Sequence, residues 1–298
     1  DIANPGEYYY SASRANHIFE FAENYCRHSK GKFGGKPVRL ELWEKAHLAT
    51  VFGFVDIEGN RKYRESILIV GKKNGKWAIL WRIPLISLLA SIVGLYMLLA
   101  DGEMGPEVYA VATKKDQSKI IWMESKRMVR KSPSLSRRVR ALVAELDTDF
   151  NDGVFKPLAS DSDTLDGLNI HCVLMDEIHQ WKQGKALYDI MADGVSAREQ
   201  PLVYITSTAG TIREDIYDQK YEEAEMVING YEDPDGYKDE HFIAFIYELD
   251  NRKEWTDETC WEKANPGLGT IKNRNTLKDK VEKAKKNPLL VKNLLCKE

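Results

Sequence analysis

The sequence predicts an α/β fold in which a mostly parallel β-sheet is flanked by helices. Five short apolar runs bounded by turn residues have the composition of buried strands, and they cover residues 66–70, 108–112, 172–175, 202–205 and 242–247. Segments with helical spacing lie between most of these runs, at residues 88–99, 117–126, 136–146, 186–195 and 216–227. Such alternation favours a parallel sheet with helices on both faces.

The composition is that of a globular protein, with 43% hydrophobic and 30% charged residues among 298. Because the formal net charge is −3, any contact with nucleic acid must come from a local basic patch. The four cysteines form no CxxC pair, which argues against a metal cluster or a disulfide framework and predicts a reducing cytoplasm.

One segment raises the possibility of a membrane span. Residues 77–100 are nearly all apolar, and Arg82 is their only charge, so length and hydropathy fit a transmembrane helix. However, Pro84 should interrupt a single helix. We therefore favour a buried helix preceded by an apolar strand or loop, and we expect no membrane contact.

The third predicted strand ends in two carboxylates, Asp176 and Glu177, as in a Walker B motif. A parallel strand would place Asp176 at the carboxyl edge of the sheet, where it can hold Mg²⁺. Glu177 is then a candidate catalytic residue that polarises the attacking water. The alternative is an ordinary surface pair after a buried strand. His171 and His179 lie near this strand without partners at metal-ligand spacing, so we expect structural roles for them.

A loop rich in glycine and lysine follows the first predicted strand. Its backbone N–H groups could wrap phosphates while Lys76 reaches the β- and γ-phosphates. The match to a P-loop is imperfect, since Val70 replaces a glycine and Trp77 stands where a Ser or Thr should ligate Mg²⁺; the alternative is a basic hairpin turn. The nucleotide-binding candidates in the loop are Gly71, Lys73, Asn74, Gly75 and Lys76.

The fourth predicted strand leads into the small hydroxyl residues Thr206, Ser207 and Thr208. Beside a Walker B strand, such residues can sense the γ-phosphate and couple its loss to a domain motion. The alternative is a common strand-to-loop turn. The order and spacing of all three motifs favour a nucleotide site.

With these motifs in place, the chain resembles the phage terminase large subunit ATPase over nearly all of its length. The resemblance depends on ordered, spaced segments: residues 40–44, 52–56, 71–76, 112–117, 165–169, 172–179, 198–201, 206–210, 246–250 and 264–269.

This resemblance implies a P-loop NTPase of the RecA/ASCE type that uses ATP and Mg²⁺ to move double-stranded DNA into a prohead. It implies a P-loop ATPase domain at residues 1–230, with an N-terminal adenine-side segment. Residues 231–298 would form a final strand and a linker or lid that leads to an absent nuclease domain. The implied partners are the portal protein, the small terminase subunit and further copies in a ring, in the host cytoplasm and transiently docked at the prohead.

The resemblance also assigns residues around the nucleotide. Trp43 and Glu44 would lie beside adenine, although Glu44 replaces the family's glutamine and puts recognition through an amide in doubt. Lys72 corresponds to a P-loop arginine proposed to act on the γ-phosphate, and we count it with Lys76 among the catalytic candidates; lysine keeps the charge but loses the planar fork.

Ten residues, 77–86, have the character of an insertion at the Mg²⁺ ligand, because their deletion would join the loop 71–76 directly to Ser87. Ser87 is the candidate second metal ligand if the insertion loops out. Otherwise the insertion predicts a hydrolysis-impaired domain.

Basic residues gather between the second and third predicted strands. They could grip DNA phosphates or act in trans on the γ-phosphate of a neighbouring subunit. The alternative is a solvated helix face balanced by Glu124 and Glu145. The candidates are Arg127, Arg130, Arg137 and Arg138, together with Arg198 further along the chain.

The sequence also bears on a helicase and on an endonuclease activity. Residues 176–179 also fit the DExH signature of helicases, but the residues after Gly230 are too few and too polar for a second RecA-like domain. The late part of the chain has no carboxylate cluster suited to two-metal cleavage, so we expect no endonuclease activity.

Overall fold

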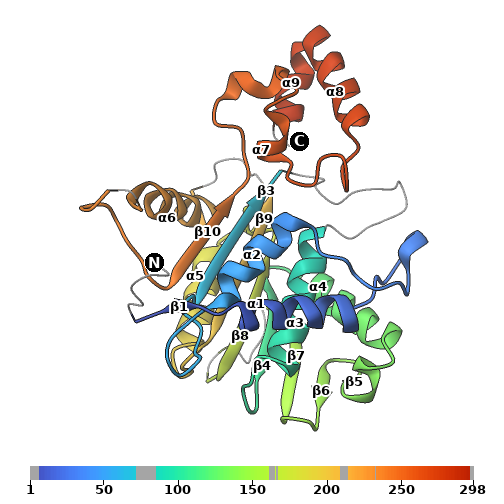
Figure 1. The fold of residues 1–298 in the computed structure, drawn as a ribbon, viewed down its shortest axis with the longest axis vertical. Helices are drawn as coiled ribbons and strands as arrows, with labels where there is room; N and C mark the ends of the chain where they lie inside the picture. The colour runs from blue at the N-terminus through green and yellow to red at the C-terminus, as the bar shows by residue number, and fades with distance from the viewer. Residues whose placement is uncertain are drawn as a thin grey trace.

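The computed structural model describes residues 7–71, 85–160, 165, 167–208, 214–231 and 233–295. Its centre is an eight-stranded sheet in the order β10-β3-β9-β8-β4-β7-β6-β5 (Figure 1). The parallel strands are β3 (Glu65–Val70), β4 (Glu107–Ala112), β7 (Gly153–Ala159), β8 (Ile170–Asp176), β9 (Leu202–Thr208) and β10 (Phe242–Ile246). The short strands β5 (Arg140–Ala141) and β6 (Leu146–Thr148) add an antiparallel edge. All five predicted strands are present, and the mostly parallel sheet is confirmed.

Side chains that alternate along each strand build two separate cores. On one face, residues such as Leu68 and Leu174 pack against α1 (Ala12–Tyr25), α2 (Leu42–Gly53), α3 (Leu85–Leu99) and α4 (Lys115–Lys131). On the other face, their neighbours Ile67 and Val173 pack against α5 (Gly184–Gly194) and α6 (Ile216–Gly230). Because every central strand is covered on both sides, the strands are apolar throughout rather than alternating, as the sequence suggested.

Shorter elements complete the chain. Strands β1 (Tyr9–Tyr10) and β2 (Phe54–Val55) form a separate two-stranded sheet. The 3₁₀ turns are η1 (Gly31–Phe33), η2 (Leu135–Arg137), η3 (Ile178–Gln180) and η4 (Arg252–Thr256), and the last helices are α7 (Trp261–Ala264), α8 (Arg274–Lys286) and α9 (Pro288–Leu295).

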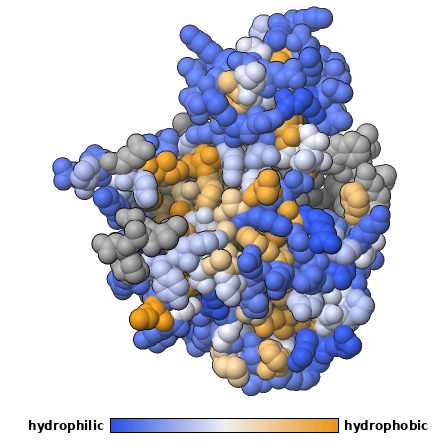
Figure 2. All heavy atoms as spheres, in the orientation of Figure 1, coloured by the Kyte–Doolittle hydropathy of each residue, from blue (hydrophilic) through white to orange (hydrophobic). Residues whose placement is uncertain are grey.

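The last three helices have an apolar cluster of their own, which includes Trp261, Leu277 and Val281. They lie beyond the carboxyl edge of the sheet, at the top of Figure 1, and Figure 2 shows a largely hydrophilic surface over them. The strand that precedes them, β10, is part of the central sheet beside β3. The division of the chain after residue 230 remains a prediction.

The predicted helix at residues 136–146 is wrong. The structure has the turn η2 there, followed by the hairpin of β5 and β6. Arg140 and Asp147 form a bidentate ion pair across this hairpin, and Nη2 of Arg140 lies 2.6 Å from Oδ2 of Asp147. This cross-strand contact, which lies seven residues apart in the sequence, overrides a helical pattern that rests on few buried side chains.

The apolar segment at residues 77–100 lies partly outside the described residues. The part that the structure describes is α3. Its side chains from Leu89 to Leu98 are buried in the core that covers one face of the sheet. Among the described residues, no helix combines the length and the apolar character needed to cross a membrane.

Candidate active site

Three parallel strands end at one edge of the sheet and bring the sequence motifs together. In the register of β8 and β9, Asp176 lies opposite Thr206, and in the register of β3 and β9, Val70 lies opposite Thr208. The first loop residue, Gly71, therefore follows β3 at the edge where the predicted coupling residues lie. The carboxyl edge of a parallel sheet is where ligands bind in open α/β folds.

The carboxylate of Asp176 joins three elements at this edge. Its Oδ2 accepts a hydrogen bond from Ser87 Oγ at 2.5 Å, and its Oδ1 accepts one from Thr206 Oγ1 at 2.8 Å. All three side chains are buried. Ser87 lies in the first turn of α3, so this helix starts directly against the end of β8. Ser87 thus contacts the carboxylate of Asp176, while its role as a metal ligand stays a prediction.

These oxygens suit a magnesium ion. Mg²⁺ prefers hard oxygen ligands and is usually held by one or two carboxylates together with substrate phosphates and water. Burial raises the pKa of Asp176, and the hydrogen bonds from Ser87 and Thr206 oppose that rise. A cation at the site would favour the ionised carboxylate that it needs as a ligand.

Glu177 stands beside this cluster in a strained backbone conformation. Its φ of 53° and ψ of 42° lie in the left-handed region, which costs a non-glycine residue roughly 1–3 kcal/mol. Its backbone N–H donates to Thr206 O at 2.8 Å, and its Oε2 accepts from Thr208 Oγ1 at 3.1 Å. The conformation turns the side chain of Glu177 toward the end of β9, and strain of this kind is common where a catalytic group must be aimed.

Each of the three predicted coupling residues contacts a different residue at the end of β8, directly after it or in the turn η3 that follows. Thr206 binds Asp176, Thr208 binds Glu177, and Ser207 Oγ lies 3.1 Å from His179 Nδ1. His179 Nδ1 also lies 3.1 Å from Glu177 Oε2. The contact between His179 and Glu177 was missed, because the sequence gives no sign that η3 turns the chain back on itself directly after β8.

The predicted adenine-side residues lie at the start of α2. Glu44 is buried and accepts the backbone N–H of Glu41 at 2.8 Å in a capping box, and burial raises its pKa to about 8. Trp43 packs edge-on against Tyr247, whose backbone N–H donates to Ile69 O at 2.8 Å near the end of β3. The indole Nε1 of Trp43 is buried and has no hydrogen-bond partner in the described part of the chain.

The remaining loop candidates, Lys72, Lys73, Asn74, Gly75 and Lys76, lie outside the described residues. Their assignment as phosphate-binding and catalytic residues stays a prediction.

The basic candidates separate into different environments. Arg127 makes an ion pair with Glu124 at 3.6 Å, as the solvated-helix alternative expects, and Arg130 on the same helix α4 is exposed. Glu145 pairs with Lys156 at 2.9 Å and so does not neutralise the patch.

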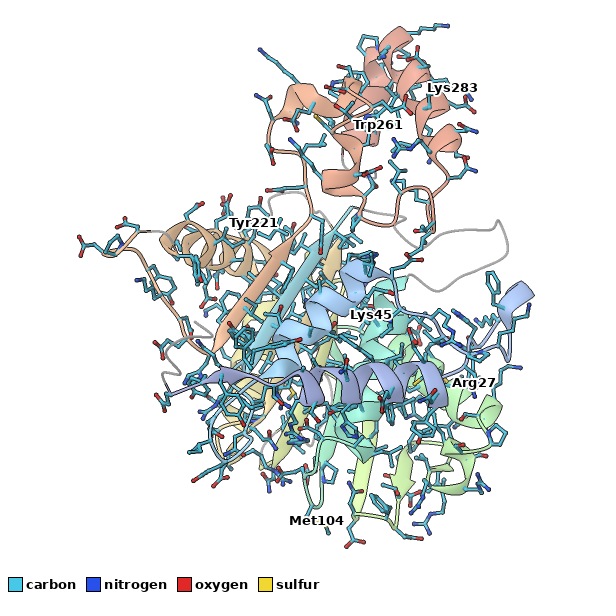
Figure 3. All side chains as sticks on the ribbon, viewed as in Figure 1. Arg27, Lys45, Met104, Tyr221, Trp261 and Lys283 are labelled. Carbon is cyan, nitrogen blue, oxygen red and sulfur yellow. The ribbon has the colours of Figure 1, made fainter. Side chains whose placement is uncertain are left out.

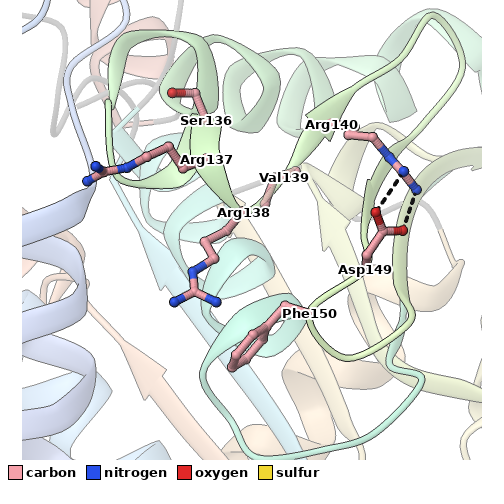
Figure 4. A pocket seen from close by; sticks show the side chains of 7 residues that line it. All are labelled: Ser136, Arg137, Arg138, Val139, Arg140, Asp149 and Phe150. Atoms are coloured by element: carbon pink, nitrogen blue, oxygen red, sulfur yellow. Dashed lines mark hydrogen bonds and ion pairs between the residues drawn. The ribbon is translucent and has the colours of Figure 1, made fainter.

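Arg137 and Arg138 line a cavity of about 290 Å³ (Figure 4). The guanidinium of Arg138 lies 4.8 Å from the centre of the Phe150 ring, and neither arginine has an ion-pair partner among the residues that the structure describes. By contrast, Arg140 in the same cavity is held by Asp147 and Asp149. Two cations therefore remain available on this surface.

Arg198 must be removed from the DNA and trans-acting candidates. Its side chain is 11% exposed, and Nη1 lies 2.6 Å from Glu103 while Nη2 donates to Gly105 O at 2.8 Å. It also donates to the carbonyl of Met104, which Figure 3 places at the end of the molecule opposite Trp261. Arg198 precedes β9. Its guanidinium is bound at the amino edge of the sheet, opposite the carboxyl edge at which Asp176 lies.

A comparison with models of known protein families identifies the family to which the chain belongs. The family model for the terminase large subunit, ATPase domain, matches residues 42–226, which is more than half of the chain. The chain belongs to this terminase family. The resemblance drawn from the ordered motifs, and the P-loop NTPase fold that it implied, are confirmed.

One of the relatives found by sequence comparison is itself a large terminase subunit. The large terminase subunit of Enterobacteria phage HK97 is 24% identical over 282 residues, which cover 93% of this chain and 51% of the relative. Protein YmfN of Escherichia coli K12 is 36% identical over 126 residues, which cover 42% of this chain and 26% of the relative. The crystal structure of the HK97 large terminase shares the fold, with a TM-score of 0.75 at 21% identity, over 95% of this chain and 54% of that one. The chain thus spans about half the length of the HK97 terminase.

A second family model, for the terminase large subunit endonuclease domain, matches residues 236–298. The prediction that this chain has no nuclease activity is therefore not confirmed. The comparisons give no support to the DExH helicase alternative.

The raised pKa of Glu44 predicts how stability depends on pH. Between the ordinary value of 4.5 and about 8, the folded chain keeps a proton that the unfolded chain has released, so this residue makes stability fall as pH rises. Glu44→Gln removes the proton but keeps an oxygen for the capping box. We expect the stability of this variant relative to wild type to increase from about pH 5 to about pH 8 by a few kcal/mol, since one pKa unit corresponds to about 1.4 kcal/mol. Urea unfolding at several pH values measures this, and a pH-independent difference would contradict it.

Proposed function

We propose that this chain is the ATP-hydrolysing motor domain of a viral DNA-packaging terminase. The observation that carries the proposal is the contact of Ser87 and Thr206 with Asp176, directly beside Glu177. These residues come from three elements far apart in the sequence, and they provide the metal-binding and water-activating groups that phosphoryl transfer requires.

In this mechanism, ATP lies at the carboxyl edge of the sheet and the loop 71–76 wraps its phosphates. Asp176 and Ser87 would hold Mg²⁺, which supplies positive charge to the phosphate oxygens when bound. Glu177 accepts a hydrogen bond from the attacking water and takes up its proton. Thr206, Ser207 and Thr208 connect this event to β9, and Trp43 and Glu44 flank the base. The Nε1 of Trp43 is buried and has no hydrogen-bond partner among the residues that the structure describes, which supports a ligand on that side.

The motor would act on double-stranded DNA at a prohead, together with a portal protein, a small terminase subunit and further copies of the chain in a ring. Membership of the terminase family supports this proposal. On the chain itself, the surface of Arg137 and Arg138 has the chemistry for DNA phosphates: two cations without ion pairs in the described part of the chain, one of them stacked on an aromatic ring.

A hydrolysis-impaired domain is the second candidate, because residues 77–86 separate the phosphate loop from Ser87. The position of Ser87 against Asp176 favours the active domain over this candidate.

Steady-state ATP hydrolysis with Mg²⁺ tests the proposal. We expect the wild-type chain to hydrolyse ATP and Glu177→Gln to lose activity by about 10²–10⁴-fold, the usual contribution of a general base. Ser87→Ala should lose about tenfold or more because it removes a ligand of the metal. Ser91→Ala is the matched control: this buried hydroxyl lies one turn later on α3 and bonds to Ser87 O at 2.6 Å rather than to Asp176.

The variant that lacks residues 77–86 separates the two candidates. Activity in the deletion variant alone would support the hydrolysis-impaired domain. Equal activity of wild type and Glu177→Gln would contradict the proposed mechanism.

The DNA-binding surface gives a separate prediction. The double variant Arg137→Ala and Arg138→Ala should bind duplex DNA more weakly, and the slope of log affinity against log salt should fall by about 1.8, because each neutralised phosphate contributes about 0.9. Arg140→Ala is the control, since Asp147 and Asp149 already neutralise that side chain. Fluorescence anisotropy over a salt series measures both, and an unchanged slope in the double variant would exclude this surface.

A further inference from the structure

The ring of His179 forms a link between Glu177 and the end of β9. Its Nδ1 lies 3.1 Å from Glu177 Oε2 and 3.1 Å from Ser207 Oγ, and its backbone N–H donates to the same Ser207 Oγ at 3.4 Å. The side chain is 4% exposed and packs edge-on against the ring of Tyr217. His179 is therefore fixed in place by β9 and by α6, which carries Tyr217.

The partners of this ring determine where its proton lies. An ionised carboxylate can only accept hydrogen bonds, so Nδ1 must carry a proton to bind Glu177 Oε2. Ser207 Oγ has its own acceptor, Thr208 O, at 3.2 Å, and is free to accept from His179. The consistent arrangement is a ring protonated at Nδ1 whose single N–H is shared between Glu177 Oε2 and Ser207 Oγ, while the backbone N–H of His179 also donates to Ser207 Oγ.

Several contacts of Glu177 fall on one oxygen, Oε2. Besides His179 Nδ1, Oε2 accepts from Thr208 Oγ1 at 3.1 Å and from Gln180 Nε2 at 3.2 Å. Gln180 comes from the exposed side of η3, whereas the other two donors depend on β9, one directly and one through Ser207. The residues that end β9 thus contribute to the orientation of the Glu177 carboxylate, Thr208 directly and Ser207 through His179.

We propose that His179 is a positioning residue that aims Glu177 for ATP hydrolysis, so that Ser207 and Thr208 control the catalytic carboxylate from β9. This inference rests on the proposed ATPase function and adds to it the route by which β9 acts on the water-activating group. A displacement of the end of β9 would move the Thr208 hydrogen bond on Glu177 Oε2 and, through Ser207, the contact of His179 with the same oxygen. Misorientation of a catalytic group lowers the rate of the chemical step without a matching effect on substrate binding.

Two substitutions separate positioning from packing. His179→Phe keeps an aromatic ring against Tyr217 but has no donor, whereas His179→Asn keeps an N–H donor near the position of Nδ1 and loses the ring. We expect His179→Phe to lower kcat for ATP by about 10–100-fold with KM within about twofold, and His179→Asn to recover most of that loss. Full activity of His179→Phe, a loss confined to KM, or no recovery in His179→Asn would each overturn the proposal.

A second measurement detects the contact without turnover. In ¹⁵N-histidine NMR spectra of the whole chain, the resonances that disappear in His179→Asn should show the tautomer protonated at Nδ1, and they should shift in Glu177→Gln and in Ser207→Ala. If the chemical shifts of the His179 resonances were the same in wild type, Glu177→Gln and Ser207→Ala, the proposal would be overturned even if His179→Phe were inactive. An inactive wild-type chain would contradict the proposed function and this inference together, whereas an active wild type with a fully active His179→Phe would contradict this inference alone.

Discussion

The carboxylate of Asp176 is the constraint on which the rest of the site depends. It lies at the end of a strand that is buried along its whole length, and it binds one hydroxyl from α3 and one from β9. A buried carboxylate must be compensated, because an unpaired charge in the interior costs several kcal/mol. The side chains that bind the carboxylate of Asp176 in the described part of the chain are the neutral hydroxyl groups of Ser87 and Thr206.

At the opposite edge of the sheet a buried carboxylate has charged and ring-nitrogen partners in place of hydroxyl groups. There Asp101 is equally buried, but Arg61 lies 2.8 Å away and His171 Nε2 3.0 Å away. Burial alone would raise the pKa of Asp101, yet these two partners hold it at about 2. At one edge of the sheet Arg61 and His171 compensate the buried carboxylate of Asp101, whereas at the other edge Asp176 accepts hydrogen bonds from the hydroxyl groups of Ser87 and Thr206.

Much of this arrangement could be predicted from sequence because it follows the periodicity of buried strands. The five strands, the Asp-Glu pair at the end of β8 and the hydroxyl residues at the end of β9 are all local patterns, and parallel pairing alone places them at one edge. The placement of Ser87 beside Asp176 was predicted only conditionally. It depends on where α3 begins after the insertion, and local composition does not settle that.

The failures have a common cause in contacts between distant residues. The strand β7 was missed because Lys156 and Pro157 interrupt its apolar pattern, although it pairs with β4 along its length. Arg198 was taken for a functional cation, but Glu103 engages it from a different part of the chain. The contact of His179 with Glu177 follows a left-handed backbone conformation at Glu177, and a non-glycine residue in that conformation leaves no sequence signal.

We propose that Asp176 and Ser87 together form a magnesium–nucleotide site, although residues 77–86 precede Ser87. The most direct measurement is the affinity for ATP by titration calorimetry, with Mg²⁺ and with the metal removed by chelation, for wild type and Ser87→Ala. We expect wild type to bind ATP far more tightly when Mg²⁺ is present and Ser87→Ala to lose most of this dependence. ATP binding that is equally tight with and without Mg²⁺, or no binding at all, would contradict it.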